Sequence, residues 1–466
     1  MVPPPTGFTN NSRRNFLRAS AITGAVLGSP GALTGQQTRT STDNRGPARN
    51  VIFMVSDGMN HGALSAAQQY HRLISGRETE WVKLYRQRPV VRCLAETCSA
   101  SSIVTDSAAA SSAWGGGIRI NNGSINVTPD GQQREPLHKK LQQRGWATGL
   151  VTTATITHAT PAGFAANVDA RGDEEVIAQQ YLDRRVDVLL GGGQKFFSER
   201  MRQAYREAAY DVVTSRSELQ QQVHDDRKRL LGIFSDSHIP YTIDRDNVPE
   251  IAAHVPTLSE MTKVALARLR HANNGFFLLV EGARIDHAGH ANDAAASLHD
   301  QLAFDEAIGT VLSFIDAHPD TLLIITTDHG CGGIQFNGVT IDGASGVAGG
   351  TYNGTTSMFT KLQGFRRSLE WLKQNNIDGL SGAPLRDALL THTGLALTDD
   401  QVKRSQGLKL SIANVFQEHT SVGWTSAMHT GELVEFCALG PGANLFPPFL
   451  RNYEVHQLLL RAWQLA

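Results

Sequence analysis

Six short apolar runs alternate with helix-like segments along the chain, and this alternation limits what it can fold into. The apolar runs cover residues 51–55, 147–152, 186–190, 276–280, 322–326 and 434–439. Runs of this length that lead straight into loops are typical of buried parallel strands. Helical patterns occupy residues 61–74, 136–143, 174–182, 258–271, 294–317 and 362–373. The sequence therefore predicts a doubly wound α/β sandwich with a mostly parallel central sheet flanked by helices.

Two segments depart from this rhythm. Residues 1–48 are polar and rich in Gly, Thr and Pro, which predicts a leader and linker before one large domain over residues 49–466. Residues 343–421 lack the strand–helix alternation and begin with a Gly- and Thr-rich stretch. They are expected to form an irregular insertion. It could be a lid, a contact in a homodimer, or a simple surface excursion.

The leader carries an export pattern. Arg13 and Arg14 stand within Ser-Arg-Arg-Asn-Phe-Leu-Arg, ahead of a short, weakly apolar run at residues 19–28. This arrangement is typical of signals read by the twin-arginine export machinery, and a basic tail is the alternative. The run is shorter than the roughly 20 apolar residues that span a bilayer, so we expect no stable membrane insertion. The expected location is the periplasm or the exterior of the cell.

The charge balance bears on binding partners, and the cysteines bear on disulfide formation. The chain has 43 Lys and Arg against 44 Asp and Glu, a net charge of −1. It has no overall field to attract nucleic acid or an anionic membrane. Of its four cysteines, Cys93 and Cys98 are close enough in sequence to pair, and unpaired thiols are the alternative.

Three of the predicted strands lead directly into acidic residues: Asp57, Glu281 and Asp328. One such residue often caps the helix that follows. Three at the same edge of a sheet would repel one another, so capping explains them poorly. In an open α/β sheet that edge is where ligands bind. A cluster of bound cations would explain all three.

Histidines near these carboxylates suggest which cations. Asp286 and His290 are four residues apart, so one turn of helix or a tight loop would direct both to one point. His329 directly follows Asp328, and His429 precedes the last predicted strand. Mixed His and carboxylate ligands suit zinc, whereas oxygen-only ligands such as Asp57, Glu281 and a threonine hydroxyl suit magnesium.

Ser107 is the candidate nucleophile. It begins a run of small residues that favours a helix, where backbone N–H groups and the helix dipole attract an anion. A metal ion could lower the pKa of its hydroxyl. The same pattern also fits a serine that only starts a helix. The Gly-x-Ser-x-Gly signal of Ser-His-Asp hydrolases is missing from the sequence.

Six segments, in order between about residues 50 and 445, resemble alkaline phosphatases. They are Asp57-Gly58, Thr105-Asp106-Ser107-Ala108-Ala109, His158-Ala159-Thr160-Pro161-Ala162 with Arg171, residues 280–290, Asp328-His329, and His429-Thr430-Gly431. The resemblance implies hydrolysis of phosphate monoesters, with a broad range of alcohols, through a phosphoserine on Ser107. It also implies that Arg171 grips two phosphate oxygens.

The resemblance further implies two zinc ions and one magnesium ion. Their ligands would be Asp286, His290 and His429 for one zinc, Asp57, Asp328 and His329 for the other, and Asp57, Thr160 and Glu281 for magnesium. His158 and His287 stand where many bacterial members have Asp and Lys, and would lie just behind the ligands.

Three other interpretations are weighed against this one. A sulfatase would need a Cys/Ser-x-Pro-x-Arg motif, which surrounds neither Ser107 nor Cys98. A phosphodiesterase of the same superfamily would usually lack the arginine that grips a monoester, here Arg171. A protein that only binds phosphate or metal is the third possibility, although every expected ligand is present.

Overall fold

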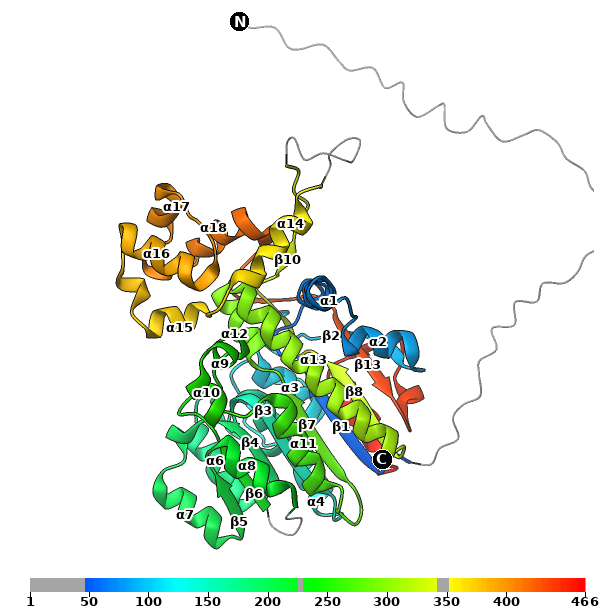
Figure 1. Ribbon diagram of the computed structural model, residues 1–466. Coiled ribbons are helices and arrows are strands. Elements are labelled where there is room, and N and C mark those ends of the chain that lie inside the picture. The colour runs from blue at the N-terminus through cyan, green and yellow to red at the C-terminus, as the bar shows by residue number, and fades with distance from the viewer. Residues whose placement is uncertain (1–46, 225–228, 342–351, 466) are drawn as a thin grey trace, which may run out of the picture. The chain divides into compact units, whose positions relative to one another are not determined.

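The computed structural model describes residues 47–224, 229–341 and 352–465. The arginine pair of the leader lies outside these residues. The core is a ten-stranded sheet in the order β14-β2-β13-β8-β1-β7-β3-β4-β6-β5 (Figure 1). The strands are β1 Asn50–Val55, β2 Val91–Glu96, β3 Ala147–Thr155, β4 Val188–Gly192, β5 Tyr210–Val213, β6 Arg229–Ile233, β7 Phe276–Glu281, β8 Thr321–Thr326, β13 Val434–Leu439 and β14 Phe449–Arg451. Among these ten, β13 alone runs against its neighbours. The predicted mostly parallel α/β sandwich is confirmed.

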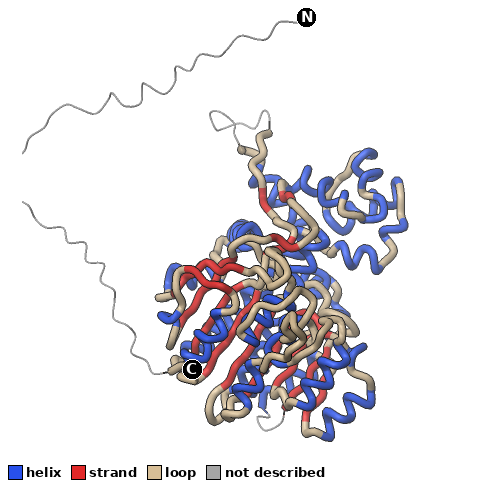
Figure 2. Tube along the Cα trace, turned by 180° about the vertical axis from the view of Figure 1, so that it is seen from behind, coloured by secondary structure: helices blue, strands red, loops and turns tan. Residues whose placement is uncertain are grey.

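The sheet is buried on both faces. In β1, Ile52 and Met54 face one apolar core, while Val51, Phe53 and Val55 face the other, as the two-residue period of a strand requires. Figure 2 shows the strands side by side from behind. The first core is covered by α1 His61–Ser75, α2 Glu80–Gln87, α8 Arg216–Gln221, α9 Thr242–Asn247, α10 Pro249–His254, α11 Leu258–Leu269, α12 Arg284–Ala291 and α13 Ala294–Ala317.

The opposite face is covered by a second set of helices. They are α3 Ser107–Gly116, α4 Leu137–Gln142, α5 Ala159–Ala165, α6 Glu174–Asp183, α7 Glu199–Glu207 and α19 Glu454–Ala462.

Among the described helices, none combines the length and apolarity that crossing a membrane requires. Cys93, Cys98, Cys331 and Cys437 are all free thiols, so the disulfide considered for Cys93 and Cys98 does not form.

The predicted helix over residues 362–373 is wrong. A short 3-10 helix, Lys361–Gly364, ends before Ser368, and α15 Leu369–Gln374 begins after it. The hydroxyl of Ser368 accepts a hydrogen bond from the backbone N–H of Trp371, which starts a new helix there. Asp244 accepts hydrogen bonds from both the backbone and the hydroxyl of Ser368 and fixes this break.

The insertion leaves the core and returns to it through one small ribbon. Strand β10 Gln335–Phe336 pairs antiparallel with β11 Val422–Gly423. Between them, the described residues from 352 onward are mainly helical, and Figure 1 shows them in yellow to orange beside α12. These helices are α14 Thr355–Thr360, α15, α16 Gly382–Thr393, α17 Asp399–Arg404 and α18 Ser411–Thr420.

Candidate metal centre and nucleophile

Three neighbouring strands bring the predicted carboxylates together. Strands β8, β1 and β7 are adjacent and parallel, so Asp328, Asp57 and Glu281 reach the same edge of the sheet. All three side chains are fully buried. Gly58 permits the close approach of α12, because a side-chain carbon at this position would lie 2.6 Å from the Cα of Asp286. Its φ of +71° also suits glycine.

A first group of ligand atoms comes from α12 and the short strand β12 His429–Thr430. Nε2 of His290 lies 3.1 Å from Nε2 of His429. Asp286 completes the group, with carboxylate oxygens 3.4 Å from Nε2 of His290 and 3.5 Å from Nε2 of His429. Nδ1 of His290 bonds to the carbonyl of Ala427, and Nδ1 of His429 to that of Thr105. These bonds leave both Nε2 atoms as free acceptors aimed at one point.

A second group lies beside Ser107. Nε2 of His329 is 3.1 Å from Oδ2 of Asp328 and 3.8 Å from Oδ1 of Asp57. The same nitrogen is 3.2 Å from Oγ of Ser107. The imidazole of His329 also stacks on that of His429, with ring centroids 3.6 Å apart. The two groups are therefore in direct contact.

A third group is richer in oxygen. Ligand atoms of Asp57, Glu281 and His158 all lie within 4.8 Å of one another. Thr160, the second residue of α5, is buried, and its hydroxyl has no hydrogen-bond partner. Glu281 accepts a hydrogen bond from the Thr152 hydroxyl through one oxygen, and its other oxygen is unpaired.

Ser107 is the first residue of α3 and is buried. Asp106 caps the helix by accepting a hydrogen bond from the backbone N–H of Ala109. Helix α3 packs closely on α5, because an added carbon at Gly163 would lie 2.2 Å from Oγ of Ser111. This close packing sets the N-termini of both helices beside the candidate ligand groups.

Arg171 reaches the same place from a loop. Its Nη1 donates to Oδ2 of Asp106 at 3.0 Å and its Nη2 to Nε2 of His158 at 3.1 Å. Each terminal nitrogen keeps a second N–H, so a fork of donors remains available. His287 lies behind the ligands, where its Nδ1 accepts a hydrogen bond from Arg284.

The buried charges are unbalanced without a cation. Burial, and then the carboxylate of Asp328, raises the pKa of Asp57 well above its usual value. Burial also raises the pKa of Glu281 to about 7. A positive ion bound beside these two carboxylates would stabilise their charged forms and so lower their pKa values.

Three nearby residues were not singled out as site residues from the sequence. The Cys331 thiol joins the group of Asp286, His290 and His429. Asp106 holds Arg171, although only its place before Ser107 hinted at this. The imidazole of His238, from a distant loop, packs edge-on against that of His158 and tilted against that of His287, and no local sequence pattern marks it.

Comparison with known proteins agrees with this geometry. The family model described as alkaline phosphatase matches residues 48–465. The chain belongs to the alkaline phosphatase family. Alkaline phosphatase 3 of Bacillus subtilis (strain 168) is 30% identical over 441 residues, which cover 90% of each chain.

Solved structures of family members are also similar. The crystal structure of Thermus thermophilus alkaline phosphatase has a TM-score of 0.82 and 32% identity, and covers 95% of this chain and 96% of its own. The cold-active alkaline phosphatase from the psychrophile Shewanella sp. has a TM-score of 0.75 and 29% identity, and covers 89% of this chain and 99% of its own. The protein is a metal-dependent hydrolase of phosphate monoesters, so the sulfatase, phosphodiesterase and binding-only interpretations are set aside.

Proposed function

We propose that the protein hydrolyses phosphate monoesters through a phosphoserine on Ser107, with two zinc ions and one magnesium ion. The observation that carries the proposal is the position of Ser107. This residue stands at the N-terminus of α3, and its Oγ lies 3.2 Å from Nε2 of His329. The zinc ligands would be Asp286, His290 and His429 at one site and Asp57, Asp328 and His329 at the other. Magnesium would bind Asp57, Thr160 and Glu281.

The residues present fit these ions. Several buried oxygens here lack any hydrogen-bond partner, although such atoms are normally paired. They are both carboxylate oxygens of Asp57, one oxygen each of Glu281, Asp286 and Asp328, and the hydroxyl of Thr160. Each belongs to a proposed ligand. Mixed imidazole and carboxylate groups suit zinc, and the oxygen-only set suits magnesium.

When bound, the ions would supply positive charge that lowers the pKa of the Ser107 hydroxyl and offsets charge on the departing oxygen. The protein's own residues position the attacking hydroxyl and the phosphate group. Oγ of Ser107 attacks phosphorus, and the bond between phosphorus and the alcohol oxygen breaks on the opposite side. Arg171 would donate its free N–H groups to two phosphate oxygens, held in place by Asp106 and His158.

A second displacement completes the cycle. Water attacks the phosphorus of phosphoserine, the bond to Oγ breaks, and inorganic phosphate and the free serine are regenerated. The backbone N–H groups at the start of α3 favour the anion in both steps. His158 also has an unpaired buried nitrogen, Nδ1, beside the oxygen-rich group. Because nitrogen suits zinc better than magnesium, we expect magnesium to bind weakly there when zinc is in excess.

The test is turnover of p-nitrophenyl phosphate by Ser107→Ala at matched metal content. Loss of the nucleophile should lower kcat by several orders of magnitude, on the order of the losses measured for serine nucleophiles elsewhere. Ser111→Ala is the control, because Ser111 lies on the same helix with its hydroxyl bonded to Ala159. Near-normal turnover by Ser107→Ala with its metals retained would refute the phosphoserine route.

We also propose that the leader directs export of the folded protein by the twin-arginine route, to the periplasm or beyond the cell. The support is the sequence around Arg13 and Arg14.

A further inference from the structure

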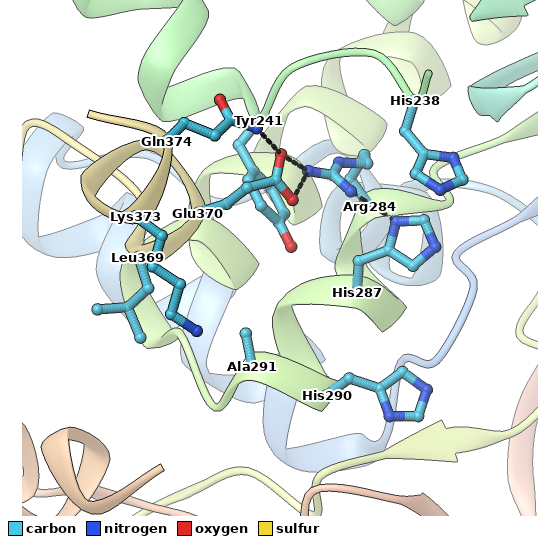
Figure 3. A pocket seen from close by; sticks show the side chains of 10 residues that line it. All are labelled: His238, Tyr241, Arg284, His287, His290, Ala291, Leu369, Glu370, Lys373 and Gln374. Carbon is cyan, nitrogen blue, oxygen red and sulfur yellow. Dashed lines mark hydrogen bonds and ion pairs between the residues drawn. The ribbon is translucent and has the colours of Figure 1, made fainter. Parts of the chain in front are cut away.

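A cavity lies beside the candidate metal centre, with which it shares His290 (Figure 3). It measures about 510 Å³, within the usual range for small-molecule sites. Helix α12 provides one wall through His287, His290 and Ala291. Helix α15 of the insertion provides the facing wall through Glu370 and Lys373. None of these α15 residues takes part in the proposed chemistry.

The cavity adjoins the group of Asp286, His290 and His429, whereas Ser107 lies beside His329 of the other group. From Ser107, a chain of contacts runs to His329, from His329 to His429, and from His429 to His290, which lines the cavity. In an in-line displacement, the alcohol leaves opposite the attacking oxygen. The part of the substrate beyond its ester oxygen would therefore extend past His290 into this cavity.

Most charges in the cavity are already compensated. Arg284 is buried, stacks on the ring of Tyr241 at 3.7 Å, and donates to both carboxylate oxygens of Glu370 at 2.8 Å. Glu370 is the only carboxylate among the described lining residues. Burial lowers the pKa of His238 to about 4, so its imidazole is neutral at pH 7.

Lys373 is the exception. It is exposed, lines the cavity and makes no ion pair with any residue that the structure describes. Its helix is held firmly at the start, where Asp293 accepts a hydrogen bond from the backbone N–H of Leu369 and Asp244 holds Ser368. The cavity thus presents one positive charge without an ion-pair partner among the described residues, on a fixed helix that lines the same cavity as His290.

We infer that this cavity binds the leaving alcohol and favours alcohols that carry a second anionic group, phosphate or carboxylate, with Lys373 as the residue that determines this preference. The inference rests on the proposed function, since it takes Ser107 as the attacking group. Gln374 and the Tyr241 hydroxyl also line the cavity and could donate to the same anion.

The test compares three esters whose alcohols share a three-carbon chain: propyl phosphate, 1,3-propanediol bisphosphate and the phosphate ester of 3-hydroxypropanoate. The metal-loaded wild type should show a higher kcat/KM for the two esters with a second anion. In Lys373→Gln this preference should fall by about fivefold, the effect of one exposed charge pair, and 0.5 M NaCl should reduce it in the wild type. Lys403→Gln is the matched control, an exposed lysine on α17 of the same insertion.

A binding measurement separates recognition from turnover. In metal-loaded Ser107→Ala, calorimetry should give a lower Kd for the bisphosphate than for propyl phosphate, and adding Lys373→Gln should shrink that ratio about fivefold. If the wild type turns over none of the three esters, the proposed function fails and this inference with it. If the esters are turned over but Lys373→Gln keeps the wild-type preference and Kd ratio, the assignment of the cavity alone is wrong.

Discussion

Glu281→Gln tests the charge balance of the candidate metal centre. The substitution should stabilise the metal-free protein and destabilise the metal-loaded protein. Glu281 ends β7 in a fully buried position, with one oxygen paired to Thr152 and the other unpaired. Glutamine has nearly the same shape and can still accept the hydrogen bond from Thr152. The substitution therefore removes the charge and little else.

The size of the effect follows from the pKa. In the metal-free folded protein, burial raises the pKa of Glu281 to about 7, whereas the unfolded chain has a pKa of about 4.3. As the pH rises between these values, the unfolded state loses its proton first, so metal-free wild type loses stability across this window. The loss attributable to Glu281 is about 1 kcal/mol at pH 5 and roughly 3 to 4 kcal/mol at pH 8.

Thermal unfolding of chelator-treated protein provides the assay. Glu281→Gln should unfold at a higher temperature than metal-free wild type at pH 8, with a much smaller gain at pH 5. With zinc and magnesium restored, the order should reverse, because the variant has lost a charged ligand. Glu175→Gln, at an exposed position on α6, serves as the control. A metal-free variant less stable than wild type at pH 8 would refute the reasoning.

Two further predictions concern the ions and the leader. Chelation should abolish activity, and zinc and magnesium together should restore it better than either alone, because the ligand sets differ in chemistry; full activity in protein shown by metal analysis to be metal-free would contradict this. Changing Arg13 and Arg14 together to Lys should retain the protein in the cytoplasm, because lysine lacks the planar guanidinium group; unchanged export of that variant on cell fractionation would point to another secretion route.

The acidic strand ends show what the sequence alone could predict. Asp57, Glu281 and Asp328 each follow a long apolar run, and parallel strands end at one edge, so their meeting follows from topology. The order β8-β1-β7 was not predictable, yet any order would bring the three to the same edge. The pair Asp286 and His290 needed only the spacing of one helical turn.

Other features of the structure depend on contacts between residues that are far apart in the sequence, so local sequence patterns do not predict them. Strands β5 Tyr210–Val213 and β14 Phe449–Arg451 are short and lie at the two edges of the sheet, so they lack a long apolar signature. The helix predicted over residues 362–373 breaks at Ser368 because Asp244, over a hundred residues away, binds it. Lys373 likewise reaches the cavity only because the insertion folds back beside α12, which no periodicity reveals.

The central claim is that Ser107 carries the phosphoryl group during turnover. The most direct measurement is acid quenching of the metal-loaded protein within a single turnover of p-nitrophenyl phosphate, followed by mass spectrometry of its peptides. The account predicts one added phosphoryl group on Ser107, which disappears as inorganic phosphate is released and never forms in Ser107→Ala. A phosphoryl group found on another residue during turnover would contradict it.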